Sequence, residues 1–133
     1  MKKPLILIFF TTLIASLASA QVKIPSKQAA KHIGETVMVC DKVYDTKFFD
    51  ESGLALLDLG GNHPNQFLTV VINKEDRGKF KDKPEDYFKG TNVCVTGIII
   101  DYHGKPEIVV TDPKDLKVDM TDDTVKHKIK TGN

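Results

Sequence analysis

The sequence predicts a small all-β domain with short helices, folded as a five-stranded Greek-key barrel. Three observations indicate this class. Short segments rich in β-branched and aromatic residues alternate between apolar and polar side chains, as strands do. Clusters of Gly, Asn, Asp and Pro separate these segments. A single helical stretch falls between the third and fourth strands, and the order β-β-β-α-β-β is that of the oligonucleotide/oligosaccharide-binding (OB) barrel.

Each element follows from a local pattern. Ser26 is a good N-cap and Gly34 a good stop, so a short helix is expected before the barrel. Asn73 begins the helical interruption, with acids in its first turn, and Pro84 starts a further helical turn that Gly90 ends. The predicted strands cover residues 36–44, 54–59, 67–72, 91–101 and 107–111.

The two ends of the chain are expected to lie outside the domain. Residues 1–20 combine a basic start, ten apolar residues and a small-residue stretch ending at Ala20, the pattern of a secretory signal peptide. The apolar run is shorter than the ~20 residues that span a bilayer. Residues 119–133 have no apolar face and predict a disordered polar tail. We expect the OB domain at residues 21–118 and an exported protein, periplasmic or secreted, without a membrane span after cleavage.

The charge of the chain excludes a strongly basic protein that coats phosphates. Its 133 residues carry 19 basic and 18 acidic side chains, and loss of the first twenty residues leaves a net charge of −1. Between residues 36 and 112 the net charge is −4. A local basic patch is compatible with these totals, so binding of nucleic acid is expected to be weak.

Export into an oxidising compartment makes the two cysteines informative. Cys40 and Cys94 lie on the outward faces of the first and fourth predicted strands, which are antiparallel neighbours in an OB barrel. We therefore expect a structural disulfide between them. Free thiols and a redox pair are the alternatives, and no C-x-x-C spacing favours the redox pair.

OB barrels usually bind ligands on strands two and three and at the loops that join strands one to two and four to five. Single-strand binding needs aromatic side chains for base stacking and cations for the phosphates. The two loops and the helix supply Tyr44, Lys47, Phe49, Arg77, Tyr102, His103 and Lys105. The alternative for the phenylalanines is packing at the barrel ends, and for Arg77 an ion pair with Asp76 or Asp45.

The sequence contains no pattern of an active site. A nuclease of the staphylococcal type is also built on an OB barrel, but it needs a carboxylate cluster and usually two arginines. This chain has one arginine, and Asp50 and Glu51 fall in a predicted turn. The four histidines lack the spacing of a zinc site. We expect neither catalysis nor a cofactor or metal.

Several segments follow one another in a recognisable order: GG (60–61), PNQFLTVVI (64–72), EDR (75–77), YFKG (87–90), VTG (95–97) and YHGKPEIVV (102–110). Together they resemble small OB-fold modules of exported bacterial proteins, which are described as DNA-binding and are in some cases joined to secreted nucleases. The resemblance covers residues 24–118. It implies the OB fold and cysteines on these two strands, whereas the DNA-binding function it implies is inherited from the fold.

The sequence therefore predicts an exported, non-catalytic OB-fold module that binds single-stranded DNA or RNA weakly. A protein-interaction or envelope-stress module, with an envelope protein as partner, is one alternative. A binder of oligosaccharides on the same barrel face is another. The pattern does not predict an oligomeric state.

Overall fold

The computed structural model describes residues 2–4 and 21–121, so most of the predicted signal peptide and most of the polar tail lie outside the described residues. The strands are β1 (Lys23–Ile24), β2 (Thr36–Phe49), β3 (Leu54–Leu59), β4 (Leu68–Ile72), β5 (Asn92–Ile98), β6 (Ile100–Tyr102), β7 (Lys105–Val109) and β8 (Leu116–Val118). The helices are the 3-10 helices η1 (Ser26–His32) and η2 (Pro113–Asp115) and the α-helices α1 (Lys74–Arg77) and α2 (Pro84–Tyr87). In this part of the chain no helix is long and apolar enough to cross a membrane.

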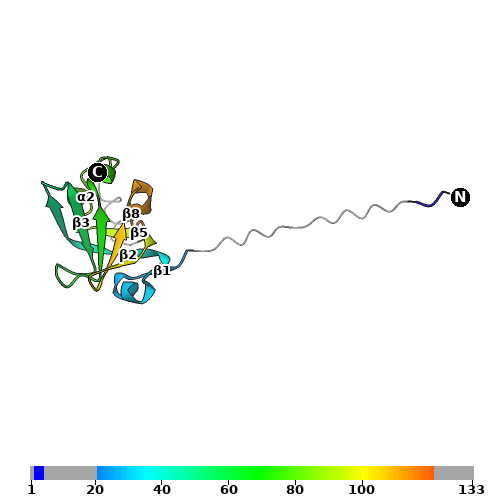
Figure 1. The fold of residues 1–133 in the computed structure, drawn as a ribbon, viewed down its shortest axis with the longest axis horizontal. Coiled ribbons are helices and arrows are strands. Elements are labelled where there is room, and N and C mark those ends of the chain that lie inside the picture. Colours follow the sequence, from blue (N-terminus) through cyan, green and yellow to red (C-terminus); the bar gives the residue numbers. More distant parts are fainter. Residues whose placement is uncertain (1, 5–20, 122–133) are drawn as a thin grey trace, which may run out of the picture.

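The strands form one strongly curved sheet (Figure 1). Its hydrogen-bonded order is β6-β7-β4-β3-β2-β5-β8, and β1 pairs with β2 in parallel. The pair β4–β7 is also parallel, and the other pairs are antiparallel. Because β5 and β6 are separated only by Ile99, the two sides of the sheet come together although its ladder is not closed. This is the partly open Greek-key barrel of the OB type, as predicted.

The observed strands differ from the predicted ones in number. The predicted fourth strand, residues 91–101, is divided at Ile99, whose backbone pairs with the loop before β2: Gly34 N donates to Ile99 O, and Ile99 N donates to Glu35 O. The two-residue β1 and three-residue β8 were not predicted, because segments this short show no alternation. The five predicted strands correspond to β2, β3, β4, β5 with β6, and β7.

β2 is longer than predicted and bends in its middle. It pairs with β5 from Thr36 to Lys42 and with β3 from Val43 to Phe49, with a register shift between Val43 and Asp45. A bulge of this kind inserts a residue, bends the strand and interrupts the alternation that sequence analysis uses. Residues predicted to lie in the loop after strand one are therefore part of β2.

The alternate residues of the strands fill the barrel. Fully buried side chains include Val39, Val43, Leu57, Leu59, Val70, Ile72, Val93, Val95, Ile108 and Val110. Phe48 and Phe80 pack against this core from its margin. Because successive side chains of a strand point to opposite faces, the residues between these positions face outward.

The predicted N-caps are corrected in part. Pro25 occupies the cap of η1, and Ser26 is its buried first residue, whose hydroxyl donates to Asp41. Gly60 lies so close to Ser26 that a Cβ there would meet the hydroxyl oxygen at 2.2 Å, and its φ of +82° also favours glycine. Asn73 does cap α1 by position, but its side chain makes no cap hydrogen bond.

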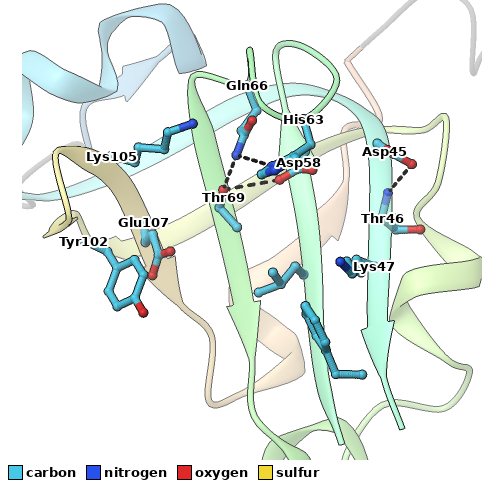
Figure 2. A pocket seen from close by; sticks show the side chains of 12 residues that line it. Asp45, Thr46, Lys47, Asp58, His63, Gln66, Thr69, Tyr102, Lys105 and Glu107 are labelled. Carbon is cyan, nitrogen blue, oxygen red and sulfur yellow. Dashed lines mark hydrogen bonds between the residues drawn. The ribbon is translucent and has the colours of Figure 1, made fainter. Parts of the chain in front are cut away.

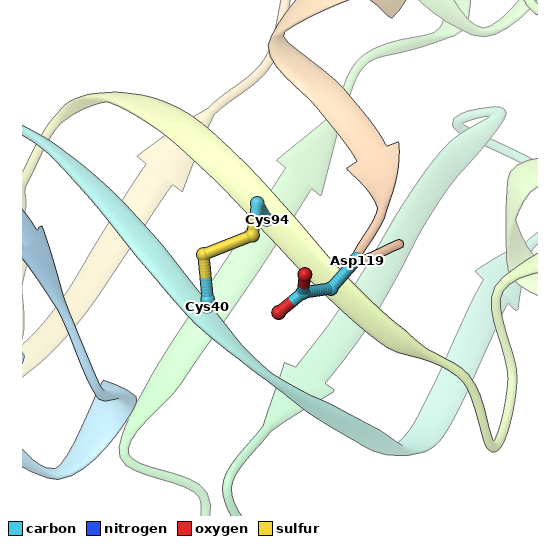
Figure 3. Close-up of side chains that lie close together, drawn as sticks. All are labelled: Cys40, Cys94 and Asp119. Carbon is cyan, nitrogen blue, oxygen red and sulfur yellow. A yellow bond between two sulfur atoms is a disulfide. The ribbon is translucent and has the colours of Figure 1, made fainter. Parts of the chain in front are cut away.

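The predicted disulfide is confirmed. Cys40 and Cys94 are directly opposite each other in the β2–β5 ladder, and their sulfurs are bonded (Figure 3). Both cysteines are half-buried, while Val39 and Val95 beside them are fully buried, so the cross-link lies on the outside of the barrel.

Candidate binding site

A hollow of about 590 Å³ lies on the outer face of the sheet (Figure 2). It is formed by β2, β3, β4, β6 and β7, with the loop before β4 at one end. Leu57 and Val70 point into the core, so their neighbours Leu56, Asp58 and Thr69 point outward and form its floor. Its volume is within the range of small-molecule and ligand sites in proteins.

A row of oxygen-bearing side chains crosses this floor. Asp45 is opposite Asp58 and Asp58 is opposite Thr69. Thr69 is in turn opposite Glu107, so the row runs across four strands from β2 to β7. The register of the sheet thus brings together residues that are far apart in the sequence.

Hydrogen bonds connect this row to the loop before β4. The Thr69 hydroxyl donates to Asp58 Oδ1 at 3.3 Å, and Gln66 Nε2 donates to Thr69 Oγ1 at 3.2 Å (Figure 2). Gln66 Nε2 also lies 3.4 Å from His63 Nδ1. Gln66 Oε1 is buried and has no hydrogen-bond partner among the described residues. Gln66 thus donates to Thr69, and Thr69 donates to Asp58, where this chain of hydrogen bonds ends.

Burial changes the pKa of the two carboxyl groups Asp58 and Glu107 in the hollow. Asp58 is only 6% exposed, and burial raises the pKa of its carboxyl against the opposing effects of the Thr69 hydrogen bond and of His63. Burial likewise raises the pKa of Glu107. A carboxylate removed from water is stabilised by hydrogen bonds to its oxygens, so both groups favour a ligand that donates them.

Aromatic rings and lysines line the two ends of the hollow. Lys47 Nζ lies 4.7 Å from the centroid of the Phe49 ring on β2. Tyr102 and Lys105 are partners in the β6–β7 ladder, and Lys105 Nζ donates to the carbonyl of Pro64 at 2.9 Å. Tyr102 is 56% exposed and Phe49 36% exposed, and Lys47 lies over the Phe49 ring.

The hollow brings together four of the seven predicted site residues: Lys47, Phe49, Tyr102 and Lys105. Tyr44 does not line it, and Lys42 Nζ lies 5.0 Å from the Tyr44 ring. His103 points its ring edge-on at Tyr102, with the centroids 4.5 Å apart, and is also outside the lining.

Arg77 lies in an ion pair away from the hollow. Its guanidinium bonds both carboxylate oxygens of Glu85, with Nε 3.1 Å from Oε2, and its Cζ lies 4.1 Å from the centroid of the Phe48 ring. The predicted ion-pair partners were wrong, because Asp76 pairs with Lys79 and Asp45 with Lys89. Arg77 therefore fixes α1 against α2 and β2.

The sequence analysis missed the floor of the hollow. Asp58 and Thr69 are the polar residues of two otherwise apolar strands, LALLDL and LTVVI, and Glu107 begins a similar run. Alternation with Leu57 and Val70 would have indicated that Asp58 and Thr69 share the outer face. Nothing in the sequence indicated that the register would place Glu107 beside them.

One group of described residues has the proximity of a metal site. Sulfur atoms of Cys40 and Cys94 and an oxygen of Asp119 lie within 4.8 Å of one another (Figure 3). Both sulfurs belong to the disulfide, whereas a metal is bound by the thiolate. Asp119 accepts hydrogen bonds from the backbone and hydroxyl of Thr121 and pairs with Lys23 at 3.7 Å. The closeness of these three residues therefore reflects the disulfide and the hydrogen bonds and ion pair of Asp119 beside it.

The fold and the hollow define the class of protein: an OB-type module with a candidate binding site on its outer face. No family model and no curated protein matches the sequence. Among solved structures, the fold is similar to part of a chain described as an aspartyl-tRNA synthetase from Leishmania major Friedlin, with a TM-score of 0.50 and 13% identity. The match covers 80% of this chain and 22% of the synthetase, and at this identity it concerns the fold alone.

Proposed function

We propose that the protein is an exported, non-catalytic module that holds a short stretch of single-stranded nucleic acid in the hollow. The observation that carries this proposal is that two exposed rings, Phe49 and Tyr102, line the same hollow as two lysines, Lys47 and Lys105. A nucleotide presents a flat base and a charged phosphate, and the rings and lysines of the hollow offer a surface for each.

The electrostatics of the site support weak binding. Two lysines at the ends contact two phosphates, while Asp45, Asp58 and Glu107 repel any phosphate between them. Each base stacked on an aromatic side chain contributes about 1–3 kcal/mol. The bases therefore supply most of the affinity. They lie over the floor of the hollow, and the phosphates of the nucleic acid lie near the two lysines at its ends.

Export rests on three features. The pattern of residues 1–20 is that of a signal peptide. A disulfide such as Cys40–Cys94 persists in an oxidising compartment. The segments that resemble exported DNA-binding OB-fold modules favour the same location and the same ligand.

The carboxylates favour a second candidate, an oligosaccharide. Sugar hydroxyls donate hydrogen bonds to carboxylates, sugar rings pack on aromatic side chains, and a site with three acids and two lysines does not repel a neutral ligand. The two candidates differ in their response to salt. Two phosphate contacts predict that log K falls with log salt at a slope of about −1.4, while a neutral sugar gives a slope near zero.

The test is fluorescence anisotropy of the oxidised chain from residue 21 onward with labelled single-stranded DNA of mixed sequence. This chain retains every described strand and helix. We expect affinity to fall about 25-fold between 20 and 200 mM salt. Tyr102→Ala should weaken binding about 5- to 150-fold, the equivalent of one lost stacking contact.

Tyr87→Ala is the matched control, because Tyr87 is 54% exposed on α2 and lies outside the hollow. It should bind as the unmodified chain does. Absence of binding at 20 mM salt, or equal losses in both tyrosine variants, would refute the proposal. A salt-independent response to oligosaccharides in the same assay would establish the second candidate instead.

A further inference from the structure

The floor of the hollow offers hydrogen-bond acceptors and almost no donors. The Thr69 hydroxyl is directed at Asp58, and the Gln66 amide is directed at Thr69 and His63. Among the residues the structure describes, no donor bonds Asp58 Oδ2. This carboxylate is more than nine-tenths buried, lines the hollow and is not sealed from it.

Glu107 extends this acceptor surface on the other side of Thr69. It lines the hollow, and no hydrogen bond to its carboxylate occurs within residues 21–121. Asp45, at the opposite end of the row, is partly occupied by the backbone amide of Thr46 and by Lys89. The free acceptors are thus concentrated at Asp58 and Glu107, between the two aromatic rings.

The nucleobases differ in how well their edges fit such a surface. Guanine presents two adjacent donors, N1–H and the 2-amino group, which match the two oxygens of a carboxylate. Adenine and cytosine each present one amino group next to a ring-nitrogen acceptor, and thymine presents one N–H between two carbonyl oxygens. Carboxylates repel those acceptors, so only guanine meets the floor with donors alone.

We propose that the hollow prefers guanine and that Asp58 is the residue that determines this preference, a proposal that rests on nucleic-acid binding at this site. The guanine base stacks against Tyr102 or Phe49, and its N1–H and 2-amino group donate to the Asp58 carboxylate, with Glu107 as the adjacent acceptor. A bidentate contact of this kind discriminates between bases by about 5- to 150-fold.

The experiment compares labelled oligothymidylates of equal length that differ in one central base. Guanine should bind at least fivefold more tightly than thymine. Inosine is the decisive ligand, because it is guanine without the 2-amino group, and it should lose most of that difference. Adenine controls for the stronger stacking of a purine. If inosine or adenine binds as tightly as guanine, the carboxylate does not read the base and the proposal is overturned.

Asp58→Asn tests the assigned residue, and Asp86→Asn is the matched control, since Asp86 is exposed on α2 outside the hollow. The ratio of guanine to adenine affinity should fall to about one in Asp58→Asn and stay unchanged in Asp86→Asn. An unchanged ratio in Asp58→Asn would overturn the assignment. Equal, measurable binding of all four oligonucleotides refutes only the preference, whereas no binding of any refutes the proposed function itself. The inosine comparison needs no variant, so it holds even if a substitution impairs folding.

Discussion

The disulfide between Cys40 and Cys94 should supply a large part of the stability of the domain. The perturbation is the double substitution Cys40→Ser and Cys94→Ser, which removes the cross-link without leaving an unpaired thiol. The two cysteines are 54 residues apart. Closing a loop of that length lowers the entropy of the unfolded chain by an amount equivalent to about 4 kcal/mol at 25 °C. Domains of this size have total stabilities of about 5–15 kcal/mol.

The assay is chemical unfolding of the oxidised chain, the oxidised chain with added reductant, and the double variant. We expect the variant and the reduced chain to unfold at the same, much lower denaturant concentration, and the unfolding temperature to fall by about 15–30 °C. Reductant should not affect the variant, which controls for other effects of the reagent. A loss below about 1 kcal/mol would refute the reasoning, because the unfolded chain would then gain little freedom from loop opening.

Two further substitutions test the electrostatics of the fold. Arg77→Ala should destabilise the domain by about 3 kcal/mol in urea unfolding at pH 7, because it leaves the buried Glu85 carboxylate unpaired. Burial raises the pKa of Glu85, but the Arg77 hydrogen bond lowers it below its ordinary value. The difference in unfolding free energy between the unmodified chain and Arg77→Ala should therefore shrink as the pH falls below about 5. A difference that stays constant with pH would contradict this account. Asp58→Asn should raise the unfolding temperature by a few degrees at pH 7, because burial raises the pKa of Asp58 and its ionised form opposes folding. That gain should disappear near pH 4, and a variant less stable at pH 7 would show that the carboxylate stabilises the fold.

The parts of the fold that sequence analysis predicted are those with regular local alternation. Val37 and Val39 alternate with Met38 and Cys40 on β2, which indicated the outward face of Cys40 and, with the strand order, its partner. The end of β2 could not be predicted in this way, because the bulge after Val43 interrupts the period. β8 pairs with β5 through only three residues and left no recognisable pattern.

The residues of the hollow likewise fall into those that the sequence predicts and those that depend on strand register. Residue type and the usual binding face of the fold suffice to select four residues that line the hollow: Lys47, Phe49, Tyr102 and Lys105. The acceptor row depends on three separate strand registers, and an error of one residue in any of them would turn a side chain to the opposite face. Arg77 was expected to pair with Asp76 or Asp45, whereas α2 brings Glu85 to it from eight residues away.

The two halves of β2, on either side of its bend, contribute to different properties: one to stability and the other to the proposed binding function. The half of β2 from Thr36 to Lys42 carries the disulfide to β5, and the half from Val43 to Phe49 carries one wall of the hollow beside β3. Cys94 lines a different, smaller hollow of about 320 Å³, together with Met38 and other residues. The floor of the hollow is held by the β2–β3, β3–β4 and β4–β7 ladders, none of which includes the cross-link. The cysteine double variant, studied below its unfolding temperature, should therefore bind single-stranded DNA within about twofold of the oxidised chain, since a cross-link acts mainly on the unfolded state. A large loss of affinity in the folded variant would show instead that the disulfide shapes the hollow through the bend in β2.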